Sequence, residues 1–169
     1  MDVPPVWWTV TTEKICSRNA ITTRSKPINY MLSKKAQYAF KALMYMAEKK
    51  DNQPVLIAEI AKKKKIPLKF LENILLELKR ADVLESKKGK GGGYFFKISP
   101  KEIPLAKIVR LIDGPIAMLP CVSLYFYERC KNCDEKQCGL HDMMILVRDA
   151  NLKILEKKTV ADLAKRNIP

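Results

Sequence analysis

The sequence has little that would place the protein in a membrane or on a secretion route. No apolar run reaches the roughly 18 residues that a membrane-spanning helix needs. The N-terminal segment 1–30 has no compact apolar core of the roughly 7–15 residues found in a signal peptide. We therefore expect a cytoplasmic protein whose thiols stay reduced. Its 5 cysteines are then better explained as metal ligands or redox groups than as disulfide bonds.

Acidic residues are scarce relative to basic ones. Asp and Glu number 18 against 32 Lys and Arg, which gives a formal net charge of +14. Such an excess favours a polyanionic partner, nucleic acid before an acidic membrane surface. Hydrophobic residues still make up 47% of the chain, so a packed core is expected and global disorder is not.

Apolar periodicity predicts a mainly α-helical chain with a small β-hairpin. Apolar side chains recur at helical spacing in three segments, residues 34–49, 57–64 and 67–80. Pro67 suits the first turn of the third helix, because its missing N–H would have no helical partner there. Two short strands at 83–86 and 94–98 enclose a basic, glycine-rich loop at 87–93. Helix, turn, helix and basic hairpin, in this order, predict a winged helix-turn-helix domain.

The second half of the chain predicts a helix that opens at Pro104, a cysteine-bearing loop and a long helix over 141–158. One face of the long helix carries Met143, Val147, Ala150 and Ile154, which alternate three and four apart as at a helix–helix seam. Thr159 and Asp162 predict a capping box on a last short helix. The expected division is a flexible extension at 1–30, the winged helix-turn-helix domain at 31–114, the cysteine-rich loop at 115–140, and a dimerisation helix with tail at 141–169.

The third helix would be the recognition helix, whose N-terminal residues reach base edges in the major groove. Lys69, Glu72 and Asn73 lie there. Glu72 can accept from a cytosine amino group, and Asn73 can pair with adenine. A solvated polar helix face is the alternative for each of them.

The hairpin loop is the second candidate DNA contact. Three successive glycines at 91–93 let the backbone approach a phosphate or a narrow groove closely, and Lys87, Lys88 and Lys90 supply cations beside them. A floppy surface hairpin is the alternative. A phosphate-binding P-loop is excluded, because no helix opening with Gly-Lys-Ser/Thr follows.

Four cysteines and the only histidine lie close together in the sequence: Cys121, Cys130, Cys133, Cys138 and His141. This many thiolate and imidazole groups in one short segment predict a metal site. Structural zinc would suit the Cys130-x-x-Cys133 pair, while an iron–sulfur cluster (2Fe–2S or 4Fe–4S) takes thiolates and sometimes a histidine. The aromatic run 125–127 can either cover such a site or pack into the core.

An enzyme that uses Cys130 and Cys133 as a thiol–disulfide pair is the alternative from another class. Such motifs usually lie at a helix start beside a βαβ pattern, and none is visible in the sequence. There is also no Ser/His/Asp set and no pair of acids in a plausible pocket. We therefore expect no enzyme and no small-molecule substrate.

From Met31 to about residue 166 the chain resembles the IscR/NsrR family of bacterial transcription regulators. The resemblance is carried by the opening 31–39, the recognition helix 66–74, the glycine-rich wing 89–94 and the Cys-Gly-Leu-His segment 138–141. It implies a dimeric winged helix-turn-helix protein that binds double-stranded DNA, and many members sense through an iron–sulfur cluster.

The chain departs from the family pattern at both sites. Lys88 stands where the family places an arginine that enters the minor groove, so the charge is kept and the planar fork is lost. Pro67 and Lys69 replace small polar residues, so the family's DNA preference is not carried over. Four cysteines replace three: Cys121 and Cys138 map most securely, and the two between them compete for the middle place or both bind.

The resulting hypothesis is a homodimer whose long helices pair across a two-fold axis. Each copy offers one recognition helix and one wing to a half-site of a pseudo-palindromic operator. Gain, loss or oxidation of the iron–sulfur cluster would reshape the loop and change the angle between the two DNA-binding domains. Such coupling requires that cluster and DNA favour different dimer arrangements.

Overall fold

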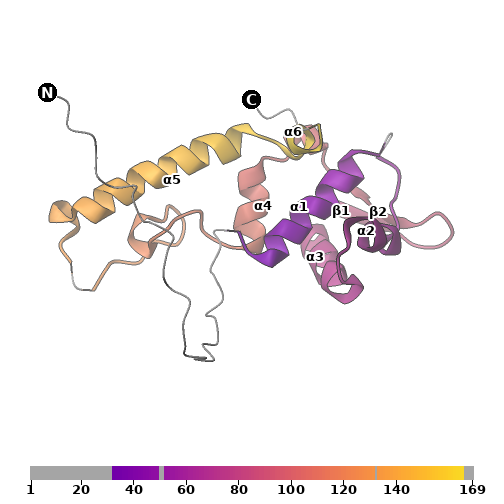
Figure 1. The fold of residues 1–169 in the computed structure, drawn as a ribbon, viewed down its shortest axis with the longest axis horizontal. Helices are drawn as coiled ribbons and strands as arrows, with labels where there is room; N and C mark the ends of the chain where they lie inside the picture. The colour runs from indigo at the N-terminus through magenta and orange to yellow at the C-terminus, as the bar shows by residue number, and fades with distance from the viewer. Residues whose placement is uncertain (1–31, 50–51, 132, 166–169) are drawn as a thin grey trace, which may run out of the picture.

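The computed structural model describes residues 32–49, 52–131 and 133–165; the predicted extension at 1–30 lies outside the described residues. The elements are α1 Lys34–Ala47, α2 Ile57–Lys64, α3 Leu68–Arg80, β1 Leu84–Lys87, β2 Gly93–Phe96, α4 Leu105–Ile112, α5 Gly139–Lys157 and α6 Val160–Ala164, with 3-10 turns η2 Pro100–Glu102, η3 Pro120–Val122 and η4 Glu135–Gln137. Figure 1 shows α1 to α4, α6 and the hairpin gathered at one end, with α5 extending away from them. The mainly α-helical fold class with one β-hairpin is confirmed.

Ser33 fixes the start of α1 and ties it to the end of α4. Its hydroxyl oxygen accepts from the N–H of Ala36 at 3.0 Å, which satisfies one of the unpaired donors of the first turn. The backbone N–H of Ser33 donates to Asp113 Oδ2 at 2.9 Å, and its hydroxyl bonds to the other carboxylate oxygen of the same residue. Asp113 is the C-cap residue of α4, so the first and last helices of the winged-helix domain are joined directly.

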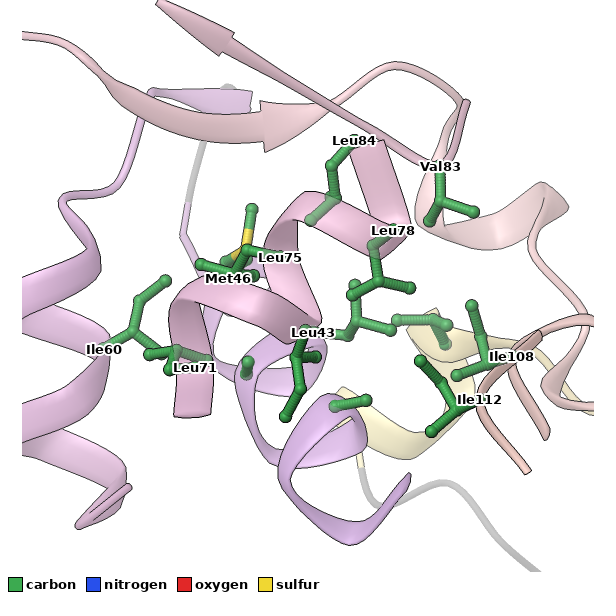
Figure 2. Close-up of a cluster of buried hydrophobic side chains, with 14 of the residues drawn as sticks. Leu43, Met46, Ile60, Leu71, Leu75, Leu78, Val83, Leu84, Ile108 and Ile112 are labelled. Atoms are coloured by element: carbon green, nitrogen blue, oxygen red, sulfur yellow. The ribbon is translucent and has the colours of Figure 1, made fainter. Parts of the chain in front are cut away.

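The apolar faces of these elements meet in one core (Figure 2). α3 buries the four residues that its periodicity predicts, namely Leu71, Ile74, Leu75 and Leu78. Leu43 of α1, Leu84 of β1 and Ile108 of α4 pack into the same cluster. Each such side chain contributes roughly 1.5–3 kcal/mol by leaving water. This burial holds one face of α3 inward and leaves the opposite face to solvent.

The turn between α2 and α3 depends on Lys65 and Pro67. Lys65 takes a left-handed φ of 53° and its N–H closes α2 on the carbonyl of Ala61. Pro67 is the N-cap residue, with φ −57° and ψ 128°. α3 therefore begins at Leu68, one residue after the predicted start.

The hairpin is anchored to the segment between α1 and α2. β1 and β2 pair antiparallel, with Leu84 opposite Phe96. Tyr94 exchanges two backbone hydrogen bonds with Val55, of 2.8 and 2.9 Å, so the 55–56 region borders the other edge of β2. Asn52 extends this border with its side chain, whose Nδ2 donates to the Phe96 carbonyl at 2.7 Å and whose Oδ1 accepts from the Phe96 N–H at 2.9 Å. β1 spans 84–87 instead of the predicted 83–86, and β2 spans 93–96 instead of the predicted 94–98. Val83 precedes β1 and is buried, and its carbonyl still accepts from the Lys97 N–H at 3.1 Å.

α5 begins two residues earlier than predicted and ends at Lys157. Cys138 is its N-cap residue, with an extended backbone. Thr159 and Asp162 form the predicted capping box at α6 in both directions. Within the described residues, no helix is both long and apolar enough to cross a membrane.

Candidate nucleic-acid interface and cysteine loop

The outer face of α3 is the part of the recognition helix that DNA can reach. At 100° per residue, the direction opposite the buried row is occupied by Lys69, Asn73, Leu76 and Arg80, and all four are exposed. The structure thus places Lys69 and Asn73 where the sequence predicted them. It adds Leu76 and Arg80, which the spacing i, i+4, i+7, i+11 from Lys69 would have revealed.

Glu72 lies on the flank of that face and is held by Lys69. The Lys69 Nζ is 3.2 Å from the Glu72 Oε2, and the Lys69 side chain is 90% exposed. An exposed ion pair of this kind is worth at most about 1 kcal/mol. DNA can therefore separate the two side chains at little cost, freeing the carboxylate to accept and the ammonium to bind phosphate or guanine.

The wing carries its cations at an exposed tip. Lys87 ends β1, and Lys88 and Lys90 follow in the loop; all three side chains are exposed. The N–H of Gly92 donates to the Gly89 carbonyl at 2.9 Å, which makes the tip a defined turn. The tip is thus a closed turn that presents its cations to solvent.

One contact joins the wing to α3, and an ion-pair group holds the base of the hairpin. Lys79, in the last turn of α3, donates from Nζ to the Ser86 hydroxyl on β1 at 2.6 Å. At the base of the hairpin, Lys97 Nζ lies 2.7 Å from Asp82 Oδ1 and 3.9 Å from Glu85 Oε1. The hydrogen bond from Lys97 lowers the pKa of Asp82, and the same bond raises the pKa of Lys97. The base of the hairpin is thus close to charge balance, while its tip is cationic.

Three thiols gather in the cysteine loop, which we define as residues 115–140. The hydrogen bond to the Cys130 thiol, with burial and the influence of Cys138, raises the pKa of Cys133 to about 12. Cys133 and Cys138 are half-buried, Cys130 is exposed, and Cys121 is buried in η3. The Cys133 thiol therefore favours its protonated form in the metal-free protein, as expected of a group whose thiolate would need a cation nearby.

His141 contributes a buried nitrogen without a hydrogen-bond partner in the described part of the chain. Its Nδ1 lies 3.5 Å from Asp142 Oδ1 without forming a hydrogen bond to it, and is shielded from solvent. A buried polar atom left without a partner is destabilising. The nitrogen is thus available to a ligand at the start of α5.

The predicted ligands are not assembled around one centre. Among residues 32–49, 52–131 and 133–165, no group of three or more His, Cys, Asp or Glu side chains is placed to hold a metal ion. The ligand set of Cys121, Cys130, Cys133, Cys138 and His141 therefore stays a prediction. By chemistry the donors fit an iron–sulfur cluster, since thiols predominate and the orphaned imidazole nitrogen matches the occasional histidine ligand.

The aromatic run 125–127 is not packed in the hydrophobic core. Tyr125, Phe126 and Tyr127 are 70%, 63% and 55% exposed, so the core-packing alternative is wrong. Tyr127 donates from its hydroxyl to Glu135 Oε1 at 2.7 Å, and this bond raises the pKa of the Tyr127 phenol. The run lies on the surface of the cysteine loop.

Comparison with known proteins decides the family. A family model described as "Rrf2: Iron-dependent Transcriptional regulator" matches residues 32–166. The chain belongs to the Rrf2 family. An rrf2-like HTH-type transcriptional regulator of Rhodobacter capsulatus is 37% identical over 143 residues, which cover 82% of this chain and 95% of the relative. The regulator IscR of Cereibacter sphaeroides is 34% identical over 87 residues, 50% of this chain and 56% of its own.

The solved structure of CymR, described as the global cysteine regulator of Bacillus subtilis, is similar with a TM-score of 0.67 and 26% identity, over 80% of this chain and 96% of CymR. This Rrf2 protein is accordingly a helix-turn-helix transcription regulator that binds DNA. The resemblance to IscR-type regulators and the winged-helix fold are confirmed. The named relatives are regulators and not enzymes, so the thiol–disulfide enzyme is set aside. The family description names iron, which gives the zinc alternative no support.

Proposed function

We propose that this Rrf2 protein is a homodimeric regulator whose affinity for a two-fold symmetric operator is set by an iron–sulfur cluster in the cysteine loop. The observation that carries the proposal is the position of the donors. The thiols of Cys130, Cys133 and Cys138 gather immediately before α5, and the unpartnered Nδ1 of His141 lies in its first turn. A change at these donors therefore acts directly on the helix that we expect to join the two copies.

The donors named above, together with Cys121, would hold the cluster. When bound, such a cluster supplies a centre that can be gained, lost or oxidised. The chain's own part is to present thiols at one end of α5 and to shield the imidazole nitrogen from water. In the metal-free protein the loop lacks the cross-link that a bound cluster would make between these donors.

The two faces of α5 support a dimer. Arg148, Leu152 and Glu156 are spaced four apart and form the face that meets the rest of the same chain, with Leu152 buried. The opposite stripe is exposed and apolar over four turns: Leu140 is 58%, Met143 55%, Leu146 65% and Ile154 62% exposed. The predicted seam residues Val147 and Ala150 lie on this stripe by helical spacing. A stripe of this size is rarely left in water by a monomer.

A groove beside the stripe extends the proposed dimer surface. It has a volume of about 540 Å³ and runs between the end of α4, the 113–118 segment and α5. Its apolar lining includes Val109, Ile116, Met118 and Leu155, and Ile154 belongs to both groove and stripe. A second copy of α5 would cover both surfaces at once. Pairing by this helix would place two recognition helices and two wings on successive half-sites of one duplex.

The test begins with anaerobic purification followed by iron, sulfide and zinc analysis and visible absorption. Sedimentation then gives the mass, and an operator selected from a random duplex library gives the affinity before and after chelation of the cluster. We expect stoichiometric iron and sulfide, a dimer, and affinities that differ between the two forms. A colourless protein with stoichiometric zinc would replace the iron–sulfur proposal, and equal affinities with and without the cluster would remove the sensing role.

A further inference from the structure

The side chain of Arg110 touches both the cysteine loop and α5. Arg110 lies on α4, whose other face is buried in the core of the winged-helix domain. Its Nη2 donates to Glu156 Oε1 on α5 at 2.7 Å. Its Cζ lies 5.1 Å from the centre of the Tyr125 ring in the cysteine loop. A planar guanidinium can make both contacts at once, since its face stacks on the ring while its edge donates to the carboxylate.

A second arginine attaches the beginning of the same loop to α5. Arg148 donates from Nη1 to the Val122 carbonyl at 2.7 Å, and its side chain is only 13% exposed. Val122 follows Cys121 directly in η3. The segment around Cys121 is therefore attached to α5 through Arg148, whereas Arg110 is part of the winged-helix domain. The contact between Arg110 and Tyr125 crosses the boundary between these two parts.

Tyr125 is well placed to report the state of the loop. Its side chain is 70% exposed, so its position depends on the loop backbone and on Arg110 and not on the core. The hollow beside it, lined by Arg110, Ser123 and Leu152 among others, has a volume of about 10 Å³. That is room for one water at most, so the contact is not a binding pocket for a small molecule.

We propose that Arg110 and Tyr125 form the link through which the state of the cysteine loop reaches the winged-helix domain. When the loop rearranges, the Tyr125 ring leaves the guanidinium, and Arg110 holds α5 through Glu156 alone. The α4–α5 joint then loosens, and the angle between the two DNA-binding domains changes. The inference rests on the proposed sensing function and assigns to Arg110 a positioning role within it.

The size of the effect follows from the contact. An exposed cation–π contact shifts an equilibrium by about two- to five-fold. Deleting the ring should therefore reduce the ratio of operator affinities between the cluster-loaded and cluster-free dimers by that factor. It should leave the fold intact, because the ring is mostly in solvent.

The experiment compares Tyr125→Leu, Tyr125→Phe and Tyr127→Leu in the full chain. Tyr127 is the matched control: it lies in the same loop, is similarly exposed, and bonds to Glu135 within the loop. The affinity ratio should fall about two- to five-fold in Tyr125→Leu. It should stay at the wild-type value in Tyr125→Phe, because phenylalanine keeps the ring face, and in Tyr127→Leu, because the Tyr127 hydroxyl bonds to Glu135 within the loop. Melting temperatures should be equal in all four proteins.

A second readout does not require the loaded protein. Hydrogen–deuterium exchange across residues 120–127 of the cluster-free protein should accelerate in Arg110→Met and in Tyr125→Leu. It should not change in Arg129→Met, which removes an exposed arginine of the same loop.

The outcomes separate the inference from the proposed function. A wild-type affinity difference that persists in full in Tyr125→Leu, or unchanged exchange in Arg110→Met, overturns the link alone. The absence of any difference between loaded and cluster-free wild type overturns the sensing function and the link with it.

Discussion

Replacing Gly93 by alanine would test the contact that holds the wing against the helix-turn-helix. Gly93 has a φ of +148°, and a Cβ built there would lie 2.4 Å from the Val55 carbonyl oxygen and 2.9 Å from the Val55 nitrogen. Both are backbone atoms, so no side-chain rotation relieves the overlap. Val55 has to move away from β2, which breaks its two hydrogen bonds with Tyr94.

The expected destabilisation can be summed from these parts. Two hydrogen bonds are worth roughly 1 kcal/mol each, and an alanine forced to positive φ costs roughly 1–2 kcal/mol. The free energy of unfolding should therefore fall by about 3–4 kcal/mol, a decrease in Tm on the order of 10 °C for a chain of this length.

Urea unfolding followed by far-ultraviolet circular dichroism measures the change, and Gly89→Ala is the matched control. Gly89 has a φ of +90° but open space around its would-be Cβ, so only the conformational cost of roughly 1–2 kcal/mol applies. Equal destabilisation of the two variants would refute the reasoning, since the close approach of Val55 to β2 would then not exist in solution.

Three further predictions concern the DNA surface, the dimer and the response to acid. Lys88→Ala should weaken operator binding and make the salt dependence of log K shallower by about 0.9 for each phosphate that the side chain neutralises, while Lys88→Arg restores both; an unchanged slope would place this lysine in solvent. Ile154→Glu should halve the mass measured by sedimentation, whereas Leu76→Glu, an equally drastic change on α3, should keep the dimer and weaken DNA binding; a dimeric Ile154→Glu protein contradicts the proposed α5 interface. The hydrogen bond from Lys49 lowers the pKa of Glu59 in the folded state, so the stabilisation is present above the ordinary glutamate pKa of about 4.3 and is lost as pH falls through the lower folded value. Glu59→Gln should therefore flatten the decline of the urea midpoint between about pH 5 and 3, and an unaltered decline would show that this pair does not contribute.

The secondary structure was largely predictable because local rules determine it. The buried row of α3 follows from apolar spacing, and the α6 cap follows from the identities of Thr159 and Asp162. Boundaries shifted where non-local contacts decide them. β2, for example, ends at Phe96, whose backbone groups bond to the side chain of Asn52, 44 residues earlier, and no local pattern contains that information.

The candidate sites were predictable in composition but not in arrangement. Lys69 and Asn73 lie on the exposed face as expected, because helical geometry fixes the direction of every residue once the buried row is known. The cysteine loop has no repeat from which positions could be derived, so the gathering of thiols around Cys133 emerges only in the structure. The contact of Arg110 with Tyr125 joins residues 15 apart through an exposed loop. The sequence marks Tyr125 as part of an aromatic run, but nothing in it indicates Arg110 as the partner.

The amide of Asn52 has a consequence for how the regulator can diversify. Its two hydrogen bonds with Phe96 secure the root of the hairpin through main-chain groups, which any residue except proline would offer at 96. The five tip positions 88–92 take no part in that attachment. Substitutions of Lys88 and Lys90 can therefore alter which duplexes are bound while the tip glycines, which are constrained by positive φ or close backbone contacts, keep the turn. New operators are then accessible to descendants of this chain without a compensating change in the interior.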